Sequence, residues 1–124
     1  MVVAVGYGIV LAASALLEFY AGFSLLLNTE KFIMGLYPDL EDQINPMVVK
    51  YGITSGIGLT SIGLLSLVPF MDEDCTRSVF MVLTYYNVLA TANNYKIAGL
   101  TPPTVIHAAL LIGCLLCTIL TFVI

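Results

Sequence analysis

The chain has 124 residues, of which 60% are hydrophobic and only 10% are charged, and its formal net charge is −4. A soluble domain of this length could not bury so much apolar surface, whereas a bilayer solvates it directly, so the composition predicts an integral membrane protein. The basic residues are too scattered to bind nucleic acid or to dock on anionic lipid as a polybasic patch: Lys31, Lys50, Arg77 and Lys96.

The first apolar run extends from Val2 to Leu27 and is long enough to cross a bilayer as a single helix. It is longer than the apolar core of a typical signal peptide, so we expect it to be retained as a membrane helix. One carboxyl side chain, Glu18, interrupts this run. Because an ionised group near the centre of a membrane helix costs roughly 2.5 kcal/mol or more, Glu18 is predicted to face other helices or trapped water.

Residues 28–46 carry five charged side chains and are expected to lie outside the hydrocarbon. In the first half, Asn28 or Thr29 can cap a helix whose apolar residues recur at helical spacing, which predicts a short interfacial helix over residues 29–37. Pro38 should end that helix, because the residue before a proline is disfavoured in the α conformation. Residues 39–45 are expected to form an acidic surface loop or a single turn.

A second apolar run, residues 47–70, predicts another membrane helix. Small side chains on one face extend a Gly-x-x-x-Gly motif: Gly52, Gly56, Thr60 and Gly63. Such a face lets a neighbour approach closely, and this neighbour is either the first helix, which we favour, or another chain. Pro69 and the acidic run 72–74 close the helix, and Thr76 or Ser78 can cap the next one.

Residues 77–97 form the most polar of the predicted spans. Polar side chains recur there at spacings of three, four and three, which places them on one helix face: Thr84, Asn87, Thr91 and Asn94. Lipid offers these groups no hydrogen bonds, so the face is predicted to point into the protein. Tyr95 and Lys96 are expected to mark the membrane interface.

The last predicted span follows a tight turn at residues 99–103 and carries His107 about one turn from its start. Together, the apolar runs predict an all-α integral membrane four-helix bundle, with the short interfacial helix between the first two spans. This single membrane domain covers residues 1–124, with spans at about 2–27, 47–70, 77–97 and 103–124.

The distribution of positive charge predicts an orientation. The first and third connections are flanked by Lys31, Lys50 and Lys96, against Arg77 alone on the other side. The positive-inside rule therefore places these two connections in the cytoplasm or its organellar equivalent. We favour an organellar inner membrane or a thylakoid as the location.

The three cysteines do not have the spacing of a metal site or a disulfide framework. Cys114 and Cys117 lie in an unbroken apolar helix and are expected to act as small packing residues. Cys75 follows an acidic run, whose negative charge should raise its pKa and make it a poor nucleophile. We therefore predict neither a metal site nor a catalytic cysteine.

Polar groups of different spans are expected to meet inside the bundle. Counting about 1.5 Å per residue from the side of the first and third connections puts five of them at similar depth: Glu18, Thr54, Ser55, Asn87 and Thr91. A shallower layer holds Lys50, Asn94 and His107. The candidate ligand-binding residues, which could line an internal funnel, are Glu18, Lys50, Asn87, Thr91, Asn94 and His107.

Three roles for this funnel are compatible with the sequence. The polar groups could only fix helix register, with Glu18 hydrogen-bonded to Asn87 and to hydroxyls of the second span. They could bind a small molecule, a lipid or a tetrapyrrole pigment, whose metal centre accepts lone pairs from Glu, Asn or His. Glu18 and His107 could instead relay protons or coordinate a transported cation. No nucleophile has an adjacent base and no carboxylates are paired, so no enzymatic activity is predicted.

The polar interruption of the first span and the glycine-rich start of the second resemble small four-helix membrane proteins of the DoxX-like kind. The segments that carry this resemblance are Leu16-Leu17-Glu18-Phe19-Tyr20-Ala21-Gly22 and Tyr51-Gly52-Ile53-Thr54-Ser55-Gly56-Ile57-Gly58-Leu59. The resemblance covers the first two spans and implies a redox-associated or chaperone-like accessory role.

We therefore expect a non-catalytic accessory subunit of a larger membrane complex, with respiratory and photosynthetic assemblies as the leading candidates. Most residues lie in predicted spans, the loops are short, and the exposed acidic segments could dock on partners. The expected partners are other integral membrane subunits and lipid, and nucleic acid is not expected.

Overall fold

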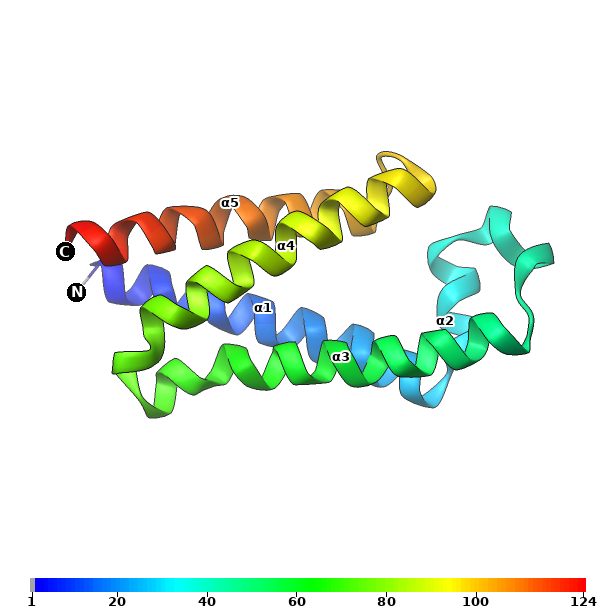
Figure 1. Cartoon of the computed structure of the whole chain (residues 1–124), viewed down its shortest axis with the longest axis horizontal. Coiled ribbons are helices and arrows are strands. Elements are labelled where there is room, and N and C mark those ends of the chain that lie inside the picture. The colour runs from blue at the N-terminus through cyan, green and yellow to red at the C-terminus, as the bar shows by residue number, and fades with distance from the viewer. Residues whose placement is uncertain (1) are drawn as a thin grey trace.

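The computed structural model describes residues 2–124, and this part of the chain is all-helical (Figure 1). The elements follow in the order α1 (Val2–Leu27), α2 (Thr29–Leu36), η1 (Pro38–Gln43), α3 (Pro46–Met71), η2 (Glu73–Cys75), α4 (Thr76–Ala98) and α5 (Pro102–Val123). The prediction of an all-α chain is confirmed for the described residues, and each long helix ends within one residue of its predicted range.

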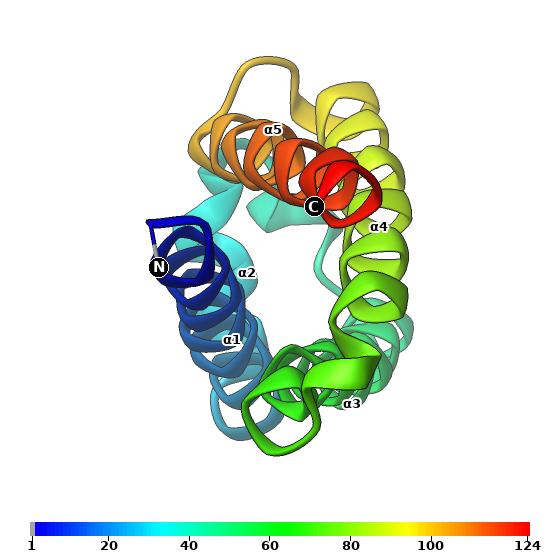
Figure 2. The ribbon, with the colours of Figure 1, turned by 90° about the vertical axis from the view of Figure 1, so that its left-hand side faces the viewer.

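The four long helices alternate in direction and are arranged around a ring in the order α1, α3, α4, α5 (Figures 1 and 2). The most extensive contacts join α1 to α3 and α4 to α5, whereas α3 and α4, and likewise α1 and α5, touch over smaller areas. The fold is therefore two antiparallel helix pairs laid against each other. The short helix α2 contacts both α1 and α3 at one end of the first pair.

Glycine residues allow α1 and α3 to approach each other closely. A Cβ atom on Gly56 would lie 2.9 Å from the backbone oxygen of Gly22, and one on Gly63 would lie 3.1 Å from the Phe19 ring. A Cβ atom on Gly52 would meet the Thr29 side chain at 2.5 Å. The structure therefore places the small-residue face of α3 against α1 and α2 of the same chain.

Within residues 2–124, three helices are long and apolar enough to cross a membrane: Ala4–Leu27, Pro46–Met71 and Pro102–Val123. Helix α4 has sufficient length but is more polar, since it contains threonines and asparagines along much of its course. The predicted span at residues 77–97 is thus a helix, but its composition does not by itself mark it as membrane-spanning.

Polar side chains and one glycine define the helix ends. The Asn45 side chain caps α3 by accepting from the amides of Met47 and Val48 at 3.0 and 3.1 Å. The turn after α4 uses Gly99, whose φ of 69° is a conformation that favours glycine.

The side-chain hydrogen bonds predicted to cap α2 and α4 are not formed. Asn28 occupies the N-cap position of α2 without a side-chain bond, and the Thr29 hydroxyl donates to the Leu25 carbonyl of the preceding helix. The N-cap position of α4 is Cys75, while Thr76 donates to the Glu73 carbonyl at 2.7 Å. In both places another helical element, α1 or η2, precedes the predicted cap, and its carbonyls are available to accept the hydroxyl.

Candidate functional site

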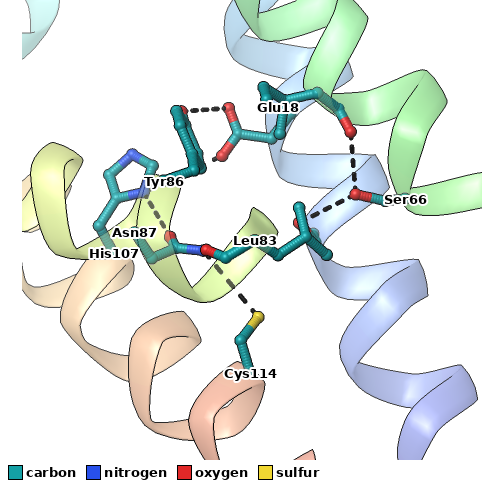
Figure 3. Close-up of polar contacts among 9 residues, drawn as sticks. Glu18, Ser66, Leu83, Tyr86, Asn87, His107 and Cys114 are labelled. Atoms are coloured by element: carbon teal, nitrogen blue, oxygen red, sulfur yellow. Dashed lines mark hydrogen bonds and ion pairs between the residues drawn. The ribbon is translucent and has the colours of Figure 1, made fainter. Parts of the chain in front are cut away.

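A buried polar network crosses the boundary between the two helix pairs (Figure 3). Glu18 on α1 is only 1% exposed, and its Oε2 atom accepts a hydrogen bond from the Tyr86 hydroxyl of α4 at 3.0 Å. Glu18 lies on the face of α1 that packs inward with Leu11 and Leu25, while Leu16 and Tyr20 point outward. The predicted inward position of Glu18 is confirmed.

His107 on α5 completes the network through Asn87 on α4. The Nδ1 atom of His107 lies 3.0 Å from Asn87 Oδ1 and 3.9 Å from Glu18 Oε1. The Asn87 amide nitrogen donates to the Leu83 carbonyl at 2.9 Å, so its Oδ1 atom is the acceptor for the histidine N–H. In neutral His107 the lone pair is then on Nε2.

Two buried oxygen atoms in this region lack a hydrogen-bond partner among the described residues. They are Glu18 Oε1 and Thr91 Oγ1. A buried polar atom without a partner is costly, and it calls for a proton, a water molecule, an ion or a ligand. Glu18 Oε1 and Thr91 Oγ1, together with the lone pair of His107 Nε2, are therefore atoms that could bind a cation or the metal centre of a cofactor.

Hydroxyl pairs lie within each helix pair. Ser66 of α3 meets Ser14 of α1 at 3.2 Å, and Thr84 of α4 meets Thr118 of α5 at 3.0 Å. The sequence pattern missed Ser66 and the role of Tyr86. Ser66 falls three residues after Gly63 on the same helix face, and this spacing could have indicated that it faces α1.

The hydrogen-bond partners of Glu18 in the structure differ from the predicted ones. Asn87 binds His107 rather than Glu18, and no hydroxyl of α3 bonds to the carboxyl within residues 2–124. His107 was expected in a shallower layer than Asn87, yet the two side chains are in contact. The turn after α4 doubles back, with Thr104 bonded to the Gly99 carbonyl at 2.7 Å, so α5 starts beside the body of α4 rather than at its end (Figure 1).

Three side chains assigned to the polar layers lie on the outside of α3: Lys50, Thr54 and Ser55. The glycine face of α3 packs on α1, and this turns the opposite face of the helix outward. The Thr54 hydroxyl donates to the Lys50 carbonyl of its own helix at 3.1 Å. Asn94 lies apart from Glu18 and accepts a hydrogen bond from Tyr37 at 2.8 Å, which links the segment after α2 to α4.

Two groups outside the long apolar helices have shifted pKa values. The hydrogen bond from the Cys75 thiol to Asp72 raises the pKa of Cys75, and the charges of Asp72 and Asp74 act in the same direction. This agrees with the prediction that Cys75 is a poor nucleophile. Burial raises the pKa of Tyr37, which keeps its hydroxyl protonated as the donor to Asn94.

Cys114 and Cys117 are buried packing residues, and their thiols do not form a disulfide.

Comparisons with protein-family models, with curated proteins and with solved structures found no match to this chain. The resemblance to DoxX-like proteins therefore remains a prediction from sequence pattern, and the proposals below are based on the geometry of this chain alone.

Proposed function

We propose that the chain is an integral membrane protein in which α1, α3, α4 and α5 all cross the bilayer and α2 lies at its surface. The arrangement of α4 supports this, since its exposed side chains are mostly apolar: Met81, Val82, Tyr85, Val88 and Leu89. The polar side chains in its middle are turned inward: Asn87 is fully buried and Thr84 and Thr91 are partly buried, while the exposed Ser78, Asn93 and Lys96 lie towards its ends. A helix with such faces can cross a membrane beside other helices although its average composition is polar.

We further propose that this bundle is a non-catalytic accessory subunit of a larger membrane complex. The observation that carries the proposal is the outward face of α3, which has an exposed strip of small and hydroxyl side chains: Thr54, Ser55, Gly58 and Ser61. No atom lies within 4 Å of the position that a Cβ atom on Gly58 would take. The hydroxyls of Thr54 and Ser61 donate to carbonyls of α3 itself, so the strip has few unmet hydrogen bonds.

Small and hydroxyl residues are the ones that let membrane helices pack closely. The other small-residue face of α3 is used against α1, whereas this strip has no neighbour among the described residues. A membrane helix of a second subunit is the partner that fits it. In a respiratory or photosynthetic assembly such a contact would hold the chain at the periphery of the complex.

Replacing Gly58 with Leu tests this docking surface. The larger side chain should prevent close helix contact at a cost of about 1–3 kcal/mol, which lowers the association constant about 5- to 150-fold. Native electrophoresis of gently solubilised membranes should show wild-type protein in a large complex and Gly58→Leu as the free subunit.

The matched control is Ala109→Leu, which enlarges an exposed residue on the outward face of α5 instead. This variant should stay in the complex. Migration of the wild-type protein as a free monomer would refute the accessory role, and equal behaviour of the two variants would remove the α3 strip as the docking surface.

A second candidate function is proton or cation translocation through the buried network. The specific observation that favours it is the unpartnered Glu18 Oε1 atom, 3.9 Å from the imidazole of His107. Ionisable residues inside membrane proteins often belong to such pathways. In proteoliposomes, flux driven by a proton or cation gradient should disappear in Glu18→Gln, while Glu30→Gln, an exposed carboxyl on α2, should retain it. Undiminished flux in Glu18→Gln would exclude translocation through Glu18.

A further inference from the structure

An open cleft of about 1020 Å³ is lined by the beginning of α1 and the end of α5. These two helix ends lie at the same end of the molecule (Figures 1 and 2). Segments from both helix pairs line it: the first turns of α1, the last turn of α3, η2, the first turn of α4 and the last turn of α5. The cleft shares none of the residues of the Glu18 network.

One part of the cleft is apolar. Its lining there comes from the early turns of α1 and from the end of α3, and it includes Tyr7, Leu11, Pro69 and Phe70. The Tyr7 ring packs on Phe80 with a centroid separation of 5.2 Å, which holds this wall in place. A wall of this kind can accept a hydrocarbon chain.

The other part of the cleft carries charges of both signs. Arg77 lies there together with the exposed carboxylates of Glu73 and Asp74. The Arg77 guanidinium donates to the Thr121 carbonyl at 2.5 Å and lies 4.6 Å from the centre of the Phe122 ring. Within residues 2–124 no carboxylate lies within ion-pair distance of Arg77. Because a guanidinium has five N–H donors, it retains capacity for an anionic group.

We propose that this cleft binds a zwitterionic phospholipid. Its phosphate binds the Arg77 guanidinium, its ammonium group lies near Glu73 and Asp74, and an acyl chain follows the apolar wall. Arginine binds phosphate oxygens through paired, charge-assisted hydrogen bonds. A lipid whose headgroup is only anionic would meet the same Arg77 but also two carboxylates, which repel it.

The position of the cleft agrees with this ligand and rests on the proposed membrane insertion. Arg77 lies at the ends of α4 and α5, where lipid headgroups would be. Under the predicted orientation this is the side away from the cytoplasm, opposite the leaflet that is rich in anionic lipid.

Native mass spectrometry of the protein in detergent micelles tests the proposal without the partner complex. The probes are palmitoyl-oleoyl phosphatidylcholine and, with a purely anionic headgroup, palmitoyl-oleoyl phosphatidylglycerol. Wild-type protein should retain one phosphatidylcholine and much less phosphatidylglycerol. Arg77→Gln should retain about tenfold less phosphatidylcholine, because it loses charge-assisted hydrogen bonds. Lys96→Gln, which removes one positive charge at the other end of α4, should behave as wild type.

Because Arg77 also contacts α5, its replacement could disturb the fold. A second variant therefore changes only exposed carboxylates of the cleft. The double change Glu73→Gln and Asp74→Asn should bind both lipids equally. Lipid retention by Arg77→Gln equal to that of Lys96→Gln, or an unchanged lipid preference in the double variant, would overturn the proposal. Free phosphocholine should not displace the lipid, and displacement at equal concentration would identify a soluble phosphate ester as the ligand instead. None of these results depends on Gly58, so they leave the test of complex formation independent.

Discussion

At the scale of single residues, Glu18 makes a buried polar contact between the two helix pairs. It has one hydrogen-bond donor in the described part of the chain, the Tyr86 hydroxyl, and the contact joins α1 to α4. A buried carboxyl that loses its single donor keeps the cost of burial without the compensating bond. The stability of the assembled bundle should therefore depend on Tyr86 more than on most polar residues.

We expect Tyr86→Phe to lower the free energy of unfolding by about 1–3 kcal/mol, because it leaves Glu18 unpaired while it preserves the ring. Thermal unfolding in detergent, followed by circular dichroism, measures this change. The neighbouring residue provides the control. Tyr85 is 66% exposed, so Tyr85→Phe should leave stability unchanged, and equal effects of the two substitutions would contradict the role given to Tyr86.

At the scale of elements, α3 has two faces of small residues with opposite roles. Gly56 lies against the backbone of α1, where a Cβ atom would come within 2.9 Å of Gly22 O, whereas the same atom on Gly58 would be in open space. The two positions lie in the same helix and differ in what they face. Substitutions that add one methyl group should therefore have opposite effects.

Gly56→Ala is expected to force α1 and α3 apart and to destabilise the protein by about 1–3 kcal/mol. Gly58→Ala should instead raise stability by up to about 1 kcal/mol, because alanine favours the helix over glycine. Thermal unfolding in detergent compares the two variants directly. If Gly56→Ala unfolds at the same temperature as Gly58→Ala, the two helices are not in contact along this face.

The ends of the elements could be predicted from the sequence because local chemistry sets them. Apolar runs set the extent of the long helices, the prolines at positions 38, 46 and 102 each begin a helical element, and the acidic run 72–74 separates α3 from α4. The side of α3 that faces inward could not be deduced in the same way. Thr54 and Ser55 have the polarity of interior groups, and only the closer approach permitted by Gly52 and Gly56 turns them outward.

At the scale of the whole molecule, the candidate site was predicted in part. Glu18, Asn87 and His107 do lie near one another, since a buried polar group in an apolar helix requires polar neighbours. Their pairing could not be predicted from depth alone. It depends on the turn between α4 and α5, which shifts α5 along α4 and brings His107 to the level of Asn87. The role of Tyr86 could not be predicted, because Tyr85 beside it has the same side chain and points outward.

The division of the bundle into two closely packed pairs determines where substitutions can be tolerated. Each pair buries its own seam, with α1 against α3 and α4 against α5, and the halves touch each other over less area. Mutations at the boundary between the halves should therefore alter the packing of one half on the other more than the packing inside either half. The smaller contact between the halves is thus where the shape of the interior is least constrained.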